Sequence, residues 1–137
     1  MFAKLLVTAA VALSVASLVA EADCLSYTRR VTVSGTLTRQ VFPGRPNFTS
    51  VARGDEPEAY FVLRLDQPLC VAANPAYPNE LVSMADILDI QLILYQPQFQ
   101  QLRPWLGKHI VLEGSLDIAA TGHHHTRVIL SDVVMQR

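Results

Sequence analysis

The segment Thr121-Gly122-His123-His124-His125-Thr126 has the richest chemistry in this 137-residue chain, because it contains three of the four histidines. An imidazole titrates near neutral pH and is the commonest metal-binding side chain. Three of them together suit metal binding, proton transfer or ligand recognition. The fourth histidine, His109, lies in a different segment. Residue type alone does not choose among these three roles.

His123 and His125 are two positions apart, so on an extended backbone they share one face while His124 points to the other. Zinc or copper bound by this pair would need further ligands, and the available candidates are Asp55, Glu56, Asp117 and His109. None of the four stands at a spacing from the histidines that is typical of a metal motif. We therefore expect the histidines to shape a cleft through loop hydrogen bonds. A zinc or copper site at His123 and His125 is the alternative, and no other cofactor is predicted.

The N-terminus has the pattern of a secretory signal peptide. Lys4 precedes an apolar run over residues 5–20, which ends in the small-x-small motif Ala20-Glu21-Ala22. The run is shorter than the roughly 20 residues that span a bilayer. We expect residues 1–22 to be removed, which leaves residues 23–137 as a periplasmic or secreted protein with no membrane span. An uncleaved anchor is the alternative.

Composition limits the remaining chain further. About 115 residues suffice for one modest hydrophobic core and are too few for two domains, so residues 23–137 are predicted to form a single domain. The formal net charge of −1 leaves no basic footprint for nucleic acid. Nucleic acid is therefore not an expected partner.

Cys24 and Cys70 are the only two cysteines. Export would place them in an oxidising compartment, where disulfides persist, so a bridge between them is predicted. A reactive or metal-binding thiol pair is the rival interpretation. That rival lacks the Cys-x-x-Cys spacing that such pairs often have.

Hydrophobic periodicity predicts a β-rich chain. The first and fourth predicted strands show strict alternation of apolar and polar residues, which is typical of half-buried strands. The predicted elements are strands at 31–38, 59–65, 87–95 and 110–118, a short helix at 98–106, and a last strand from Val128 that bulges near Ser131-Asp132. Phe61 and Leu65 are expected to face the core.

This order predicts a mainly β fold: a five-stranded, OB-like, partly open Greek-key barrel with one short helix between strands three and four. A small β-sandwich is the competing architecture. In an OB barrel, the loop between strands one and two and the loop between strands four and five flank the same binding face. Residues 43–58 should therefore lie close to residues 119–126, and together form one polar cleft.

The candidate ligand-binding residues come from both of these loops. They are Arg45, Asn47, Asp55, Glu56, His123, His124 and His125. A guanidinium such as that of Arg45 presents a planar fork of donors to a carboxylate, a sugar or a partner's charged side chain. Alternatively, Arg45 pairs with Asp55 or Glu56 and only holds the long loop in place. No catalytic residue is assigned, because a histidine with an acid is too common a pair to define a catalytic constellation.

Four motifs, Phe42-Pro-Gly-Arg-Pro-Asn-Phe48, Gly54-Asp-Glu-Pro-Glu58, Ile90-Gln-Leu92 and Thr121-Gly-His-His-His-Thr126, carry a resemblance to a known family. The chain resembles small secreted bacterial domains catalogued as domain of unknown function 4431, over nearly all of its predicted mature length. The family has no established activity. Related domains are found beside a cysteine-rich module of the lysozyme-inhibitor type, so the resemblance implies an envelope binding or inhibitory role by association.

The function predicted from these residues is that of an exported binding module, not an enzyme, that engages a protein or an envelope ligand through the two-loop cleft. A histidine-dependent metal-binding protein or metalloenzyme is one alternative. A purely structural envelope domain is the other.

Overall fold

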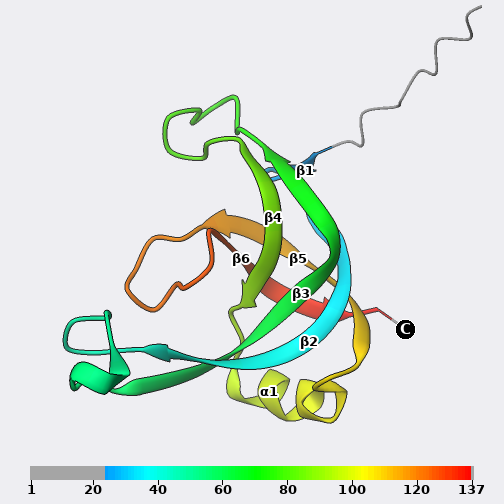
Figure 1. The fold of residues 1–137 in the computed structure, drawn as a ribbon. Coiled ribbons are helices and arrows are strands. Elements are labelled where there is room, and N and C mark those ends of the chain that lie inside the picture. Colours follow the sequence, from blue (N-terminus) through cyan, green and yellow to red (C-terminus); the bar gives the residue numbers. More distant parts are fainter. Residues whose placement is uncertain (1–23, 137) are drawn as a thin grey trace, which may run out of the picture.

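The computed structural model describes residues 24–136, which form a mainly β structure with a closed five-stranded barrel and one short helix (Figure 1). The elements are β1 (Leu25–Ser26), β2 (Val31–Pro43), the 3-10 helix η1 (Val51–Arg53), β3 (Pro57–Ala72), β4 (Met84–Leu92), α1 (Gln96–Leu102), the 3-10 helix η2 (Arg103–Trp105), β5 (His109–Ile118) and β6 (Val128–Met135). The predicted signal peptide, residues 1–22, lies outside the described residues. Within residues 24–136, no helix is long and apolar enough to cross a membrane.

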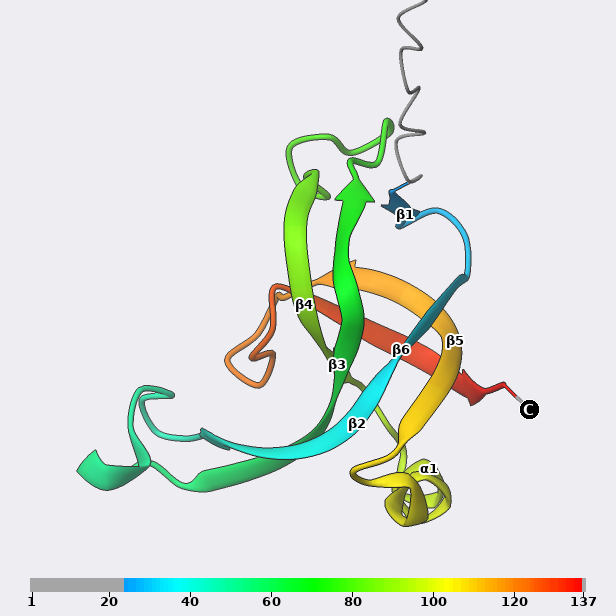
Figure 2. The same cartoon turned by 45° about the vertical axis from the view of Figure 1, so that its right-hand side comes forward.

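The pairing of the strands confirms the predicted OB-like barrel. β2 pairs antiparallel with β3 on one edge and with β5 on the other, while β4 pairs antiparallel with β3 and β6 with β5. A short parallel pairing between β4 and β6, at Gln91↔Ile129 and Leu92↔Leu130, closes the ring (Figure 2). The helix α1 lies between β4 and β5, which are the third and fourth barrel strands, as predicted.

The barrel interior is filled by the apolar residues of the alternating patterns. Phe61 and Leu65 on β3 face inward, as predicted, and so does Leu63 between them. Leu102 of α1 also belongs to this core, so the helix covers one end of the barrel. Burial of apolar area stabilises a fold at roughly 25 cal/mol per Å², and this single cluster is therefore what holds the barrel together.

Several elements extend differently from the prediction. β2 continues beyond residue 38 to Pro43, and β4 runs from Met84 to Leu92 where a strand at 87–95 was predicted. β3 continues through Pro68 to Ala72, because it pairs with β4 again at Leu69 and Val71 after a register shift that follows Arg64, and with β1 at Val71 and Ala72. A proline is tolerated at such an irregular position, where its missing N–H breaks no ladder bond. The helix begins at Gln96 and gives way to a 3-10 helix that contains Pro104.

The predicted bulge in the last strand is present. The β5–β6 register moves from Glu113↔Val134 to Ser115↔Ser131, so β6 has an extra residue at this point. Asp132 has a φ of 50° there. Such a bulge bends the strand locally and increases its twist.

The predicted disulfide joins Cys24 to Cys70. It ties the start of the described chain to the end of β3, where β1 also pairs in parallel through Leu25↔Val71. The bridge closes a loop with a sequence separation of 46 residues. Its main effect is therefore to restrict the unfolded chain.

Replacing both Cys24 and Cys70 by serine is expected to lower the free energy of unfolding by about 4 kcal/mol, the loop-entropy value for a loop of this length. Urea unfolding of the wild type and the double variant measures the difference. Wild-type protein unfolded under reducing conditions is the control and should match the variant. Equal stability of all three samples would contradict a stabilising role for the bridge.

Candidate functional site

The two loops that the sequence predicted to be neighbours do meet. The β2–β3 loop and the β5–β6 loop lie on the same side of the barrel (Figure 1). Phe48 of the first loop contacts the His123 ring edge-on, with 5.1 Å between ring centroids. Phe42, at the end of β2, stacks on His125 at 4.3 Å with the two rings parallel. Aromatic contacts therefore join segments that lie about 80 positions apart in the chain.

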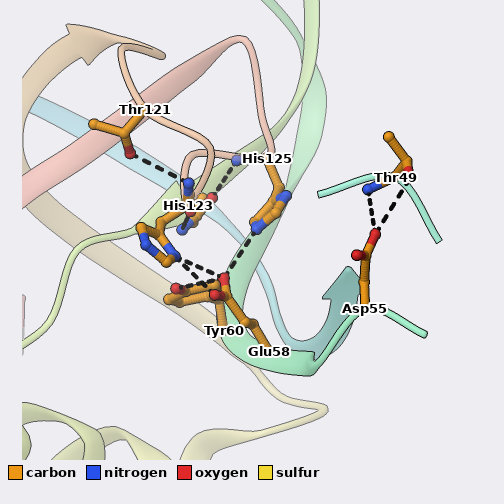
Figure 3. Close-up of polar contacts among 8 residues, drawn as sticks. Thr49, Asp55, Glu58, Tyr60, Thr121, His123 and His125 are labelled. Carbon is orange, nitrogen blue, oxygen red and sulfur yellow. Dashed lines mark hydrogen bonds and ion pairs between the residues drawn. The ribbon is translucent and has the colours of Figure 1, made fainter. Parts of the chain in front are cut away.

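Glu58 is the point on which the histidines converge (Figure 3). Its carboxylate oxygens lie 2.8 and 2.9 Å from Nδ1 of His123. Nε2 of His125 lies 3.5 Å from the Oε2 atom, and the Tyr60 hydroxyl donates to the same oxygen at 3.0 Å. We call Glu58, Tyr60, His123 and His125 the Glu58 cluster.

Electrostatics keep the Glu58 carboxylate charged. Partial burial on its own would raise the pKa of Glu58, but the hydrogen bonds from His123, Tyr60 and His125 outweigh it and lower the pKa overall. Tyr60 responds in the opposite direction: burial, then the hydrogen bond to Glu58 and its negative charge, raise the pKa of the phenol to about 12. The cluster therefore contains a fixed anion and a neutral phenol near pH 7.

The two histidines differ in their access to solvent. The His125 side chain is 10 % exposed, since it lies against the Phe42 ring. The His123 side chain is 49 % exposed although one of its ring nitrogens faces Glu58. When His123 is neutral and donates from Nδ1 to the carboxylate, its Nε2 is an acceptor available to a ligand. His123 is thus the member of the cluster that can contact another molecule.

Two glycines allow the loops to approach this closely. A Cβ on Gly44 would lie 2.5 Å from an oxygen of the Glu58 side chain, and a Cβ on Gly122 would lie 3.0 Å from the Phe48 ring. Any larger residue would displace the neighbour. The turn formers of both loops therefore also serve the packing of the cluster.

The Gln91 side chain holds the β5–β6 loop, which contains the three histidines, in place. It is fully buried on β4, where the Nε2 atom donates to the carbonyl of His123 at 2.9 Å and Oε1 accepts from the backbone N–H of His125 at 2.6 Å. The backbone N–H of Gln91 also donates to the Thr126 hydroxyl. These bonds hold the loop on the outer face of the barrel, over Val62, which is fully buried although the strand alternation points it outward.

The predicted residues of the first loop lie elsewhere. Asp55 is buried and accepts bonds from the backbone N–H groups of Asn47, Thr49 and Ser50, so it organises its own loop. The bonds from Ser50 and Thr49 are the largest causes that lower the pKa of Asp55 to about 2. Asp55 was predicted to hold this loop by pairing with Arg45. In the structure it holds the loop by accepting bonds from backbone N–H groups.

Arg45, Asn47 and Glu56 are exposed on the same loop, and in the described part of the chain none of their side chains forms a hydrogen bond or ion pair with the Glu58 cluster. The Arg45 carbonyl accepts a bond from the Glu56 N–H, which closes the loop through the backbone. His124 bonds within its own loop, since its Nδ1 accepts from the N–H of Ala120. Of the seven predicted ligand-binding residues, two therefore belong to the cluster.

The arrangement around Glu58 differs from a metal centre. Among the described residues, no three His, Cys, Asp or Glu side chains are placed to hold a metal ion together. His123 and His125 direct ring nitrogens at Glu58 itself, in place of an empty point between the three groups. Two other candidate ligands are engaged elsewhere, since Asp55 binds loop backbone and His109 pairs with Asp66 at 2.7 Å. Asp117 accepts a bond from the N–H of Ile118.

Glu58, Tyr60 and Gln91 were missed at the level of sequence. Glu58 and Tyr60 are two apart at the start of β3 and so share its outer face, which the strand periodicity could have indicated. Gln91 is a polar residue inside an apolar strand, a pattern that points to a buried hydrogen-bonding role. The sequence pattern did not show that β3 begins at Pro57, and this boundary is what places Glu58 and Tyr60 on the strand.

Fold and site together define a small OB-like β-barrel with a histidine–carboxylate cluster where two loops meet. Residues 89–134 match the family model described as Domain of unknown function (DUF4431), which confirms the resemblance for the motifs at 90–92 and 121–126. The motifs at 42–48 and 54–58 lie before the matched region. The matched region includes Gln91 and the three clustered histidines, whereas Glu58 lies before it. No curated protein and no solved structure matches the chain.

Replacing Glu58 by glutamine is expected to lower the pKa of Tyr60 from about 12 toward its usual value near 10, since two of the three causes of its rise are lost. NMR titration of the tyrosine ring carbons measures this pKa. A phenol whose pKa is higher in the folded state stabilises the fold below pH 10, and this contribution disappears as the pH rises to about 12. Asp66→Asn, which alters the acid beside His109, should leave Tyr60 unchanged; an unchanged Tyr60 in Glu58→Gln would refute the coupling.

Proposed function

We propose that this protein is an exported binding domain that engages a protein or an envelope ligand at the surface around His123. The ligand contacts the exposed His123 ring and the neighbouring β2–β3 loop, while Glu58 and His125 hold His123 in position. Periplasmic or secreted localisation is part of the proposal and rests on the signal-peptide pattern of residues 1–22.

The observation that carries the proposal is the convergence of the two loops on Glu58. The half-exposed imidazole of His123 is held by its surroundings. They comprise four aromatic or imidazole rings, three hydrogen bonds and one negative charge. Such pre-organisation lowers the entropy lost when a ligand binds. It occurs at the end of the barrel where OB folds commonly bind their ligands.

The hydrogen bonds favour recognition over covalent chemistry. Within residues 24–136 the His123 ring has Glu58 as its hydrogen-bond partner, and no serine, threonine or cysteine side chain bonds to that ring. A nucleophile activated by a histidine must lie within hydrogen-bond reach of it. His123 is instead directed toward solvent, where an incoming ligand supplies the partner for its second nitrogen.

Replacing His123 by alanine is expected to weaken binding by about tenfold or more, the usual cost of removing a central contact. Protein with a C-terminal tag is immobilised, and detergent-solubilised envelope extract from the native host is passed over it at increasing concentration. Saturable retention by the wild type and its loss in the variant support the proposal.

Tyr77→Ala is the control, because this ring is also exposed, at 56 %, and lies in the β3–β4 loop, outside the two loops that form the site. It should retain as much as the wild type. Equal loss in both variants, or no saturable retention by the wild type, would overturn the proposal, and the second result would favour a purely structural envelope domain.

A metal-dependent function is the second candidate, favoured by the fact that ring nitrogens of His123 and His125 face one carboxylate. It makes a distinct prediction: zinc or copper would bind near stoichiometrically and raise the unfolding midpoint of the wild type but not of the His123→Ala variant. Because both nitrogens already contact Glu58, we expect no such shift. Elemental analysis of untagged protein, with thermal unfolding after addition of each metal, measures it.

A further inference from the structure

A groove separates α1 and η2 from the strands β5 and β6, away from the histidine loop. Its volume is about 840 Å³, in the range of ligand pockets. The side chains that line it include Gln98, Leu102, Trp105, Val111, Val133 and Met135. Among the described residues that line the groove, none is Asp, Glu, Lys or Arg, and the one titratable side chain is that of His109, whose ring is paired with Asp66. The groove is therefore suited to an uncharged, largely apolar occupant.

One wall of this groove is a strand edge without a neighbouring strand. Within residues 24–136, β6 pairs with β4 only at Ile129 and Leu130. Beyond Leu130 the chain of β4 has left the sheet to enter α1, while β6 continues to Met135 along β5 alone. An edge of this kind presents backbone donors and acceptors to any extended segment that approaches it.

The register shows which backbone groups face the groove. The N–H of Gln136 donates to the carbonyl of Val111, so Gln136 is directed at β5. In an antiparallel ladder successive residues alternate in direction, which turns the N–H and C=O of Met135 away from β5. The Val133 carbonyl has the same direction but is already occupied, since it accepts a bond from the Gln98 side chain of α1 at 2.9 Å. The main-chain groups of Met135 are therefore the ones that an added segment would pair with.

The shape of the groove selects one kind of occupant. The opposite wall is formed by α1 and η2, so an occupant of the groove meets the β6 edge on one side and the helices on the other. The bulge at Asp132 also opposes edge-to-edge pairing with another copy. Trp105, 38 % exposed, has the Lys108 ammonium 5.8 Å from its ring centroid, and the rest of the ring offers an aromatic surface for an apolar side chain of that segment.

We propose that this groove binds an extended, uncharged segment of a partner protein, which adds as a strand along β6 from Val133 to Gln136. Main-chain bonds to Met135 supply the affinity, and an apolar side chain on Trp105 and Leu102 supplies the selectivity. This site is separate from the Glu58 cluster, and either one can fail its test without affecting the other.

The test uses a phage-displayed library of random short peptides, selected against the full chain. Enriched peptides should be apolar and uncharged at their centre, and should shift the NMR amide signals of Trp105 and residues 133–136 but not those of residues 123–125. Methylation of the peptide backbone nitrogens that face β6 should weaken binding about tenfold, because strand addition depends on main-chain hydrogen bonds. Methylation of the intervening nitrogens should not.

Trp105→Ala should also weaken binding by about tenfold. Tyr77→Ala, which removes an exposed aromatic from the β3–β4 loop, is the matched control and should bind as the wild type does. Thermal unfolding of both variants shows whether they remain folded. If Trp105→Ala unfolds, the methylated peptides still decide the question on the wild type.

Three results would overturn the proposal. They are the absence of any enriched peptide, signal shifts outside the groove, and binding that is insensitive to backbone methylation, which would indicate a pocket for side chains or small apolar molecules. Concentration-dependent dimerisation through the same residues would identify a second copy as the occupant and would also count against it.

Discussion

The site depends on one buried amide, the side chain of Gln91. It is fully buried on the strand that closes the barrel, and a buried polar group must find partners or cost about 1–3 kcal/mol. Gln91 finds them in the backbone of His123 and His125. Closing the barrel and placing the histidine loop are therefore coupled, because the same residue takes part in both.

Once that loop is held, its histidines have different roles. His125 is pressed against Phe42 and serves the packing, whereas His123 shares the Glu58 carboxylate and remains half exposed. Glu58 holds the cluster together because its carboxylate is the shared hydrogen-bond acceptor of several donors; its role as a surface charge is secondary. The cluster is thus a rigid support for one imidazole, and in the described residues the ring nitrogens of His123 and His125 are directed at the Glu58 carboxylate.

The barrel presents two surfaces with different chemistry. At the loop end the surface is polar and built from side chains that contact one another across the sequence. Beside α1 the surface is apolar and includes a strand edge. Both follow from OB topology, since the loops flank one end of the barrel and the short β4–β6 pairing leaves the rest of β6 without a second partner.

The sequence by itself determined the strand order, the inward residues such as Phe61, the β6 bulge, the disulfide and the proximity of the two loops. These follow from periodicity, turn chemistry and cysteine count, which are local properties. Only the tertiary structure decided that Glu58, and not Asp55 or Glu56, meets the histidines. Three acidic residues within four positions are equivalent in composition, and which one faces the second loop depends on where β3 begins and how its pleat turns each side chain.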